Sequence, residues 1–426
     1  MKTYLKKIFK VLSLIKPRDI WDAVKIVVSC PMGLILRLFK KRLWIVSEME
    51  HTARDNGYWF FKYMRENYPE RNVFYPIRFD SPDHEKVAKL GNVIRHGSFK
   101  HHIYAWCAEA DISARTGRGL PAPFMSRLFQ VRGFYPFKSV FLQHGVNMSA
   151  APFLEKKRNR IDLFITSTEA EAKGLQDDLG YAEKQVKVIG LTRYDQLNEF
   201  KVNPKQILLM PTWRWWLYPD LGRITDADRL AVKNSTYVKT YCEFLGNDRL
   251  NTFLRENNLK LLFFPHNQMQ PFIQEFKGND NILIASTEEY DVQTALKESA
   301  YLITDYSSIS FDFAYMKKPM CYFQFDYSEF REKHYPEGYF SYKNHGFGPI
   351  LETVDGLIDE LIAAYNNGFE MAEEYKQRVD TTFKYRDNNN SKRTLEAIEK
   401  LLKRLYNILW LRANSERRTL AKELNK

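Results

Sequence analysis

The sequence predicts an α/β protein built from two doubly wound parallel sheets. Short apolar runs alternate with segments of helical length along most of the 426 residues. Runs this short and this apolar are typical of parallel strands that are buried on both faces. The chain is also longer than one ordinary core requires, so length alone favours two or more domains.

The predicted strands fall into two groups along the chain. The first half contains six, at residues 43–47, 72–77, 110–114, 139–143, 163–166 and 186–190. The second half contains five, at residues 206–210, 261–265, 281–285, 301–304 and 320–325. The polar stretch 198–205, with Pro204 just before a new strand, separates the groups. We therefore expect domains at residues 43–197 and 203–390 that face each other across a cleft, followed by a helix at residues 391–426.

Residues 1–42 form a basic amphipathic region. Residues 1–46 contain eleven Lys or Arg against two Asp, so most of the formal net charge of +12 lies there. Leu5, Ile8 and Leu12 share one helical face, and Lys6 and Lys10 lie on the other, a pattern typical of interfacial helices. We expect this region to bind an anionic membrane surface. A helix packed on the protein's own core is the alternative.

The sequence predicts neither a transmembrane helix nor a signal peptide. The apolar run 26–36 is about half the ~20 residues that a spanning helix needs, and Pro31 is expected to interrupt it. No small-residue cleavage site follows the basic start. The four cysteines lie far apart and predict no disulfide framework or zinc site, which fits a reducing compartment. We expect a peripheral protein on the cytoplasmic face of the membrane.

The segment ITDYSSISFDF at residues 303–313 has the pattern of a buried strand, a tight turn and a helix. Thr304 ends the predicted strand, and Ser307 and Ser308 stand where the helix begins. Hydroxyls and unpaired backbone N–H groups at a helix start favour an anion. We predict that these three residues hold phosphate oxygens. The alternative is that the serines only cap the helix.

Two histidines follow predicted strands, one in each half. His144, in LQHGV at residues 142–146, is placed to take a proton from an attacking hydroxyl, and Gly145 would let an acceptor come close. His266, in FFPHNQ, would donate a hydrogen bond or positive charge to a diphosphate as its bridging bond breaks. Arg214, in MPTWR, also ends a strand and suits phosphate. A structural role is the alternative for each histidine.

Taken together, these motifs resemble the CDP-glycerol glycerophosphotransferase family, the teichoic acid primases and polymerases of Gram-positive bacteria and related capsule enzymes. The resemblance covers residues 43–393. It is carried by ARDNGYWFFKYM, LQHGV, VIGLTRYD, MPTWR, the His266 segment, YDVQTALKESAYLITDYSSISFDFAYMKKP and EGYFSYKNHGFGP. The chain departs from the family pattern at Gln143, where many members have tryptophan, and at the PHN setting of His266.

The resemblance implies a GT-B-like fold in which the second domain holds the CDP moiety and the first receives a lipid-linked acceptor. It implies that His144 is the base and that His266 lies near the donor phosphates. Gln143 and Gly145 would then lie on the acceptor side. The donor-site motif would comprise Thr304, Asp305, Ser307 and Ser308, and the basic start would attach the enzyme to the membrane as a monotopic protein.

We therefore expect an enzyme that transfers an alditol phosphate, with glycerol phosphate as the first choice, from a CDP-alditol to an acceptor hydroxyl and releases CMP. CDP-ribitol as donor and a GT-B glycosyltransferase using a nucleotide sugar are the alternatives. A non-catalytic scaffold for anionic polymers is less favoured, because the chain combines two histidines with a hydroxyl cradle. A nucleic-acid binder is also less favoured, because aromatic residues do not interleave with the basic ones. The aspartates of the chain do not show the spacing of a metal-binding motif, so we expect no tightly bound metal. Mg²⁺ would arrive only with the diphosphate.

Overall fold

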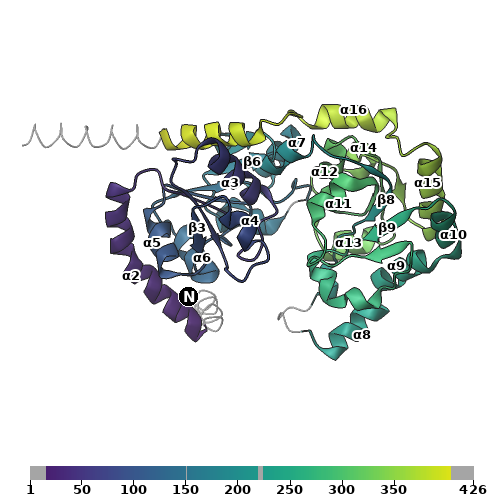
Figure 1. Ribbon diagram of the computed structural model, residues 1–426, viewed down its shortest axis with the longest axis horizontal. Helices are drawn as coiled ribbons and strands as arrows, with labels where there is room; N and C mark the ends of the chain where they lie inside the picture. Colours follow the sequence, from purple (N-terminus) through teal and green to yellow (C-terminus); the bar gives the residue numbers. More distant parts are fainter. Residues whose placement is uncertain (1–15, 150, 219–223, 404–426) are drawn as a thin grey trace, which may run out of the picture.

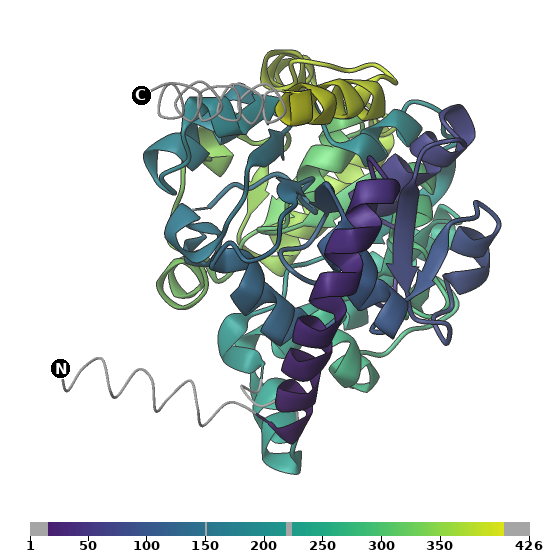
Figure 2. The same ribbon diagram turned by 90° about the vertical axis from the view of Figure 1, so that its left-hand side faces the viewer.

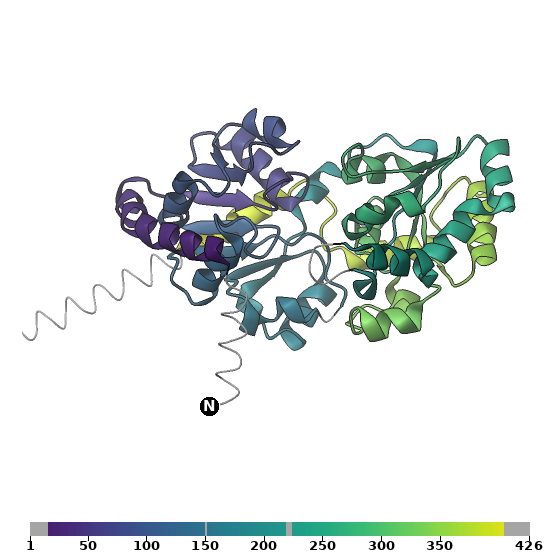
Figure 3. The same ribbon diagram turned by 90° about the horizontal axis from the view of Figure 1, so that it is seen from below.

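The computed structural model describes residues 16–149, 151–218 and 224–403, which form two α/β domains side by side (Figure 1). Seen from below in Figure 3, the domains are two distinct lobes. The predicted basic helix within residues 1–15 and the chain beyond residue 403 lie outside the described residues.

The first domain contains a seven-stranded sheet in the order β3-β2-β1-β4-β5-β6-β7, and all of its strand pairs are parallel. Its strands are β1 Trp44–Ser47, β2 Val73–Ile77, β3 Val93–Arg95, β4 Ala110–Ser113, β5 Lys138–Phe141, β6 Leu163–Thr166 and β7 Val186–Val188. Its helices are α2 Pro17–Phe39, α3 Asn56–Asn67, α4 His84–Ala88, α5 Phe99–Cys107, α6 Pro123–Val131 and α7 Glu169–Asp177. This arrangement confirms the predicted doubly wound parallel sheet.

The second domain contains a six-stranded parallel sheet in the order β10-β9-β8-β11-β12-β13. Its strands are β8 Asn203–Leu209, β9 Lys260–Phe263, β10 Ile282–Ile284, β11 Ser299–Thr304, β12 Met320–Phe323 and β13 Ile350–Leu351. Its helices are α8 Asp226–Asn234, α9 Thr236–Gly246, α10 Asp248–Glu256, α11 Val292–Glu298, α12 Ile309–Tyr315, α13 Tyr327–Lys333, α14 Tyr342–His345, α15 Val354–Asn366 and α16 Glu373–Thr382.

Short 3₁₀ segments complete the connections. They lie at Pro152–Leu154, Lys156–Arg158, Glu183–Gln185, Thr192–Gln196, Trp215–Leu217 and Asn267–Glu275. The strands β3 and β13 were not predicted from the sequence. Both are edge strands: β13 has only two residues, and β3 has only Val93 and Ile94 before Arg95, so neither contains an apolar run long enough to recognise.

A helix over residues 390–403 follows α16 and runs back over the first domain (Figure 1). Its buried side chains Leu395, Ile398 and Leu402 join the apolar core that also contains Val46 and Ile165 of the first sheet. The chain therefore crosses between the domains twice.

The two domains share an apolar core as well as a chain connection. Val146, Leu191 and Tyr194 of the first domain pack in one buried cluster with Leu302 and Phe311 of the second. Because this cluster lies beside the carboxyl ends of β5 and β11, it fixes the spacing of the loops that follow those strands.

Helix α2 lies across the outside of the first domain (Figure 2). It continues without a break through Pro31, so the prediction that Pro31 interrupts this segment was wrong. Gly33 allows its close contact with α5, because a Cβ there would lie 2.4 Å from the Cβ of Trp106. Within the described parts of the chain, no helix is long and apolar enough to cross a bilayer.

Candidate active site

Gln143 fixes the turn that follows β5 and presents His144. It has a φ of 62°, a conformation uncommon for a residue with a side chain. Its side-chain amide donates to the Ile165 carbonyl at 2.6 Å and to Glu171 Oε1 at 3.0 Å. Gln143 is only 2% exposed. In this geometry it supports the loop from inside the domain, which corrects the expectation that its side chain lines the acceptor side.

Glu171 holds the other end of the same loop. Its carboxylate accepts the backbone N–H of Asn147 at 2.6 Å and that of Ser167 at 2.9 Å. Burial raises the pKa of Glu171 to about 7, although these hydrogen bonds oppose the shift. The residues on both sides of His144 are thus tied to β6 and α7.

The His144 imidazole is half-buried, and its Nδ1 has no hydrogen-bond partner among the described residues. Burial lowers the pKa of His144 well below its ordinary value, and nearby Arg115, Arg193 and His266 lower it further. The ring is therefore neutral at pH 7, and a neutral imidazole is the form that accepts a proton.

His266 follows β9 in the second domain and lies close enough to His144 to influence its ionisation. Its Nδ1 accepts the backbone N–H of Gln268 at 3.2 Å, which leaves the ring proton on Nε2. Burial, with a contribution from Arg115, lowers the pKa of His266 to about 4. The neutral ring is thus equipped to donate one hydrogen bond from Nε2.

Ser307 and Ser308 come between β11 and α12 and meet the His144 loop directly. Both serines are half-buried. A Cβ built on Gly145 would lie 2.4 Å from Ser308 Oγ, so only glycine allows this approach without displacing the hydroxyl. The contact joins the two motifs that the sequence singled out in different halves of the chain.

Thr304 and Asp305 lie beneath the serines, where they support the turn. Both are fully buried. Thr304 Oγ1 donates to the Met210 carbonyl at 2.8 Å, and Asp305 accepts the backbone N–H of Thr212 at 2.7 Å. The Thr304 hydroxyl and the Asp305 carboxylate, which were expected to lie at the donor phosphates, are therefore engaged inside the domain.

Arg214 is also fully buried, and its guanidinium is paired on two sides. It donates to Asp326 at 2.6 and 3.0 Å and to Asp305 at 2.9 Å. A further hydrogen bond of 2.7 Å goes to the Thr212 carbonyl. Because its donors are occupied inside the domain, Arg214 joins β8 to β11 here, which corrects the prediction that it contacts phosphate directly.

A second buried arginine, Arg193, ties the two domains together. Its guanidinium donates to both carboxylate oxygens of Asp312 on α12, at 2.6 and 2.8 Å, and to Asp55 at 2.7 Å. Asp312 lies one turn after Ser308. The pair therefore anchors α12, and with it the serines, to the domain that carries His144. Sequence reasoning quoted the VIGLTRYD motif but gave Arg193 no role.

Sequence reasoning also missed Arg115 and His334. Arg115 follows β4 and influences the ionisation of both site histidines. Its signal was available, because it comes directly after a predicted strand. His334 lies beside the Trp213 ring, at 5.1 Å between centroids, and His266 contributes to lowering its pKa to about 3, after burial and Arg214. No sequence pattern indicated His334.

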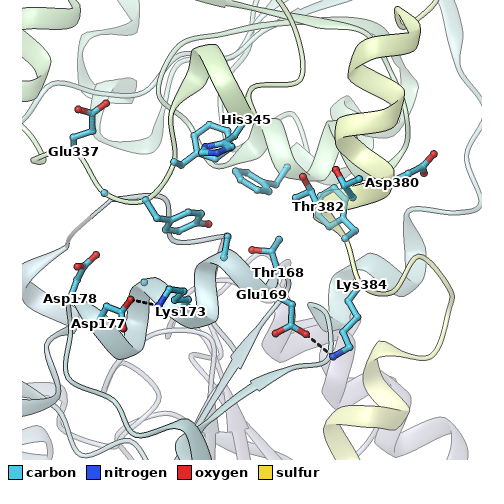
Figure 4. A pocket seen from close by; sticks show the side chains of 18 residues that line it. Thr168, Glu169, Lys173, Asp177, Asp178, Glu337, His345, Asp380, Thr382 and Lys384 are labelled. Atoms are coloured by element: carbon cyan, nitrogen blue, oxygen red, sulfur yellow. Dashed lines mark hydrogen bonds and ion pairs between the residues drawn. The ribbon is translucent and has the colours of Figure 1, made fainter.

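A cavity of about 1130 Å³ lies near these residues but does not include them. Its walls come from α7, from residues 337–345 and from residues 380–384 (Figure 4). Both lining lysines are paired inside it, Lys173 with Asp177 at 2.8 Å and Lys384 with Glu169 at 2.6 Å. Asp380 pairs with Lys317 at 2.7 Å, and the remaining carboxylates Asp178 and Glu337 leave the lining negative, so it disfavours phosphate.

In residues 16–149, 151–218 and 224–403, no group of three or more His, Cys, Asp or Glu side chains is arranged to hold a metal ion. The prediction that Mg²⁺ arrives only with the diphosphate stays a prediction.

Comparison with known families gives a match over most of the chain. Residues 29–400 match the family described as CDP-Glycerol:Poly(glycerophosphate) glycerophosphotransferase. The minor teichoic acid biosynthesis protein GgaB of Bacillus subtilis (strain 168) is 32% identical over 366 residues, which cover 85% of this chain and 40% of GgaB. The teichoic acid poly(glycerol phosphate) polymerase of the same organism is 26% identical, over 71% of this chain and 41% of the polymerase. The chain thus spans about two fifths of these two relatives.

Solved structures show the same fold. The wall teichoic acid polymerase TagF superposes with a TM-score of 0.62 at 16% identity, over 92% of this chain and 99% of the TagF chain. A TagF variant soaked with CDPG superposes with a TM-score of 0.60 at 18% identity, over 91% of this chain and 98% of that chain. A UDP-N-acetylglucosamine 2-epimerase-like protein from Listeria monocytogenes gives 0.53 at 13% identity, over 85% and 97% of the two chains.

Proposed function

Because this chain belongs to the CDP-glycerol:poly(glycerophosphate) glycerophosphotransferase family, we propose that it transfers glycerol phosphate from CDP-glycerol to a hydroxyl of a lipid-linked teichoic-acid-like or capsular acceptor. CMP is the second product. The contact of the His144–Gly145 loop with Ser308 carries the proposal, because it brings a proton acceptor of one domain to a hydroxyl-lined turn of the other.

His144 acts as the general base. The acceptor hydroxyl gives its proton to the neutral imidazole as its oxygen attacks the β-phosphorus of the donor. The new P–O bond forms as the bond between the β-phosphorus and the bridging oxygen breaks, and CMP leaves with that oxygen. A positioned base of this kind typically contributes ~10² to 10⁴ in rate.

His266 and the serines act on the donor side. Nε2–H of His266 and the hydroxyls of Ser307 and Ser308 donate hydrogen bonds to phosphate oxygens, on which negative charge accumulates as CMP departs. Positioning and electrostatics carry most of phosphoryl transfer, so neutral donors that are fixed in place before reaction suit this role.

A donor panel tests the proposal. The purified protein is incubated with CDP-glycerol, CDP-ribitol and UDP-sugars in turn, with a lipid-linked acceptor, and the released nucleotide is measured. We expect CMP release from CDP-glycerol. The rate of this release should fall by a factor of ~10² or more in His144→Ala. His51→Ala is the matched control, because the His51 side chain is 51% exposed and pairs with Glu50. Wild-type turnover by His144→Ala would remove the proposed base.

The same panel separates the alternatives. One relative, from Bacillus spizizenii, is described as a teichoic acid ribitol-phosphate primase, so CDP-ribitol is the second donor to examine. CMP release from CDP-ribitol alone would change the alditol and leave the reaction class intact. Turnover of a UDP-sugar alone would indicate a glycosyltransferase on the same fold.

We also propose that α2 docks the enzyme on the cytoplasmic face of an anionic membrane as a peripheral protein. Ten large apolar side chains of this helix are between 41% and 80% exposed: Ile20, Trp21, Val24, Val27, Val28, Met32, Leu34, Ile35, Leu38 and Phe39. Most of them recur at intervals of three and four residues, which forms one stripe opposite the face that packs on α5. The exposed basic residues Lys16, Arg18 and Lys41 lie near the two ends of the stripe and complement anionic lipid.

Vesicle sedimentation tests the docking. We expect the full chain to pellet with vesicles that contain phosphatidylglycerol and to stay in the supernatant with pure phosphatidylcholine. The triple variant Val24→Glu, Val28→Glu, Ile35→Glu should lose most of the bound fraction. Leu230→Glu is the matched control, since Leu230 is 60% exposed on the second domain. Equal pelleting of the triple variant and wild type would contradict the docking.

A further inference from the structure

The loop 115–119, RTGRG, lies beside the His144 loop at the carboxyl edge of the first sheet. Strands β4 and β5 pair in parallel with Ser113 opposite Phe141, so Arg115 stands level with the turn that presents His144. Ser113 Oγ accepts the backbone N–H of Arg115 at 3.2 Å and donates to its carbonyl at 2.6 Å. The backbone at Arg115 is therefore fixed before any ligand arrives.

The Arg115 guanidinium has no ion-pair or hydrogen-bond partner within the described residues, although it is half-buried. The two carboxyl groups that influence the ionisation of Arg115, Asp55 and Glu48, are already engaged by other groups. Asp55 pairs with Arg193 at 2.7 Å. Glu48 is buried and accepts the backbone N–H groups of Arg54, Asp55 and Tyr58, and burial raises its pKa to about 8.

Arg193 and Arg214 show how this fold treats its other buried arginines. Each of them pairs with two carboxylates. A partly buried guanidinium without such a partner is unfavourable for the fold, so its presence beside a reaction site indicates a function that needs positive charge. An arginine fork matches phosphate oxygens in shape and charge.

We propose that Arg115 holds a phosphate group of a substrate between His144 and His266. This inference rests on the proposed function and adds a binding residue from the first domain to it. The chemistry recognised is a phosphate ester or diester oxygen, which comes either from the diphosphate of the donor or from the growing end of a polyol phosphate acceptor.

Three variants of the full chain test the assignment. Arg115→Gln removes the charge, Arg115→Lys keeps the charge and loses the fork, and Arg118→Gln is the control, an exposed arginine of the same loop. Isothermal titration with CDP-glycerol in the absence of acceptor gives the donor Kd, and CMP release at varied acceptor gives the acceptor KM. We expect Arg115→Gln to weaken one of these constants by about 10- to 100-fold. Arg115→Lys should recover part of the loss and Arg118→Gln should match wild type.

The two arms distinguish the sources of the phosphate. A raised donor Kd assigns Arg115 to the diphosphate, and a raised acceptor KM with unchanged donor Kd assigns it to the acceptor. Unchanged constants in both arms would overturn the inference. If the wild-type protein neither binds CDP-glycerol nor releases CMP, the proposed function itself fails.

Two further readouts exclude a purely structural role. Arg115 lowers the pKa of His144, together with burial, Arg193 and His266, and it also lowers the pKa of His266. Its removal should therefore move the acid limb of the kcat/KM profile to higher pH. The Tm of Arg115→Gln should equal or exceed that of wild type, because no protein partner is lost. A clear fall in Tm would overturn the inference, since it would assign the guanidinium to the fold.

Discussion

Removing the Arg193 side chain should cost more stability than any surface ion pair of this protein. In Arg193→Met, three charge-assisted hydrogen bonds of 2.6, 2.7 and 2.8 Å disappear, and the carboxylate of Asp312, which is 1% exposed, is left buried without a cation. Breaking a buried pair from one side typically costs about 3 to 5 kcal/mol, because the remaining charge stays desolvated. Urea unfolding, followed by circular dichroism, measures the loss.

The double variant Arg193→Met, Asp312→Asn isolates the cause. It should recover part of the lost free energy of unfolding, because the stranded charge is gone. Lys384→Ala breaks another ion pair between the domains, the one with Glu169. The two side chains of this pair are 46% and 66% exposed, so the free energy of unfolding of this variant should stay close to that of wild type. A cost below about 1 kcal/mol for Arg193→Met, or strict additivity in the double variant, would refute the reasoning.

Other predictions concern the reaction site. Gly145→Ala should lower kcat by about 10- to 100-fold with little change in Tm, because the new methyl group displaces the Ser308 hydroxyl. Steady-state kinetics measure kcat and thermal unfolding measures Tm. An unchanged kcat would contradict the role of this contact. Because the pKa of His144 is lowered, kcat/KM should stay level from pH 8 down to ~6.5 and fall only at lower pH, where protonation removes the base. A decline that begins near pH 7.5 would show that a group other than His144 controls the rate. Glu171→Ala should cost roughly 1 to 3 kcal/mol in urea unfolding, because Gln143 and two backbone N–H groups lose their acceptor, whereas unchanged stability would show that the loop does not depend on it.

The sequence was sufficient for the architecture because buried parallel strands have a local signal. All eleven predicted strands overlap strands of the two sheets, and His144, His266, Ser307 and Ser308 follow strands as expected. Edge strands β3 and β13 were missed because neither has more than two consecutive apolar residues. Helix α2 was predicted to break at Pro31 because a local rule for proline outweighed the packing of the whole helix on α5, which the sequence does not reveal.

The roles of the arginines were harder to predict, because their partners are distant in sequence. Arg214 looked like a phosphate ligand at a strand end, yet Asp305 and Asp326 occupy it from 91 and 112 residues further along the chain. Arg115 also follows a strand, but the sequence around it matched no motif that indicated a function. What separates the two residues is whether a carboxylate lies beside each guanidinium, and only the fold determines that.

The returning helix 390–403 has a consequence for how this protein is made. Leu395, Ile398 and Leu402 belong to the core of the first domain, but a ribosome synthesises them after the whole second domain. Until this helix is synthesised, the apolar surface of the first domain that it covers stays exposed, and chaperones recognise surfaces of this kind. The half of the molecule that emerges first is therefore the half whose folding is completed last.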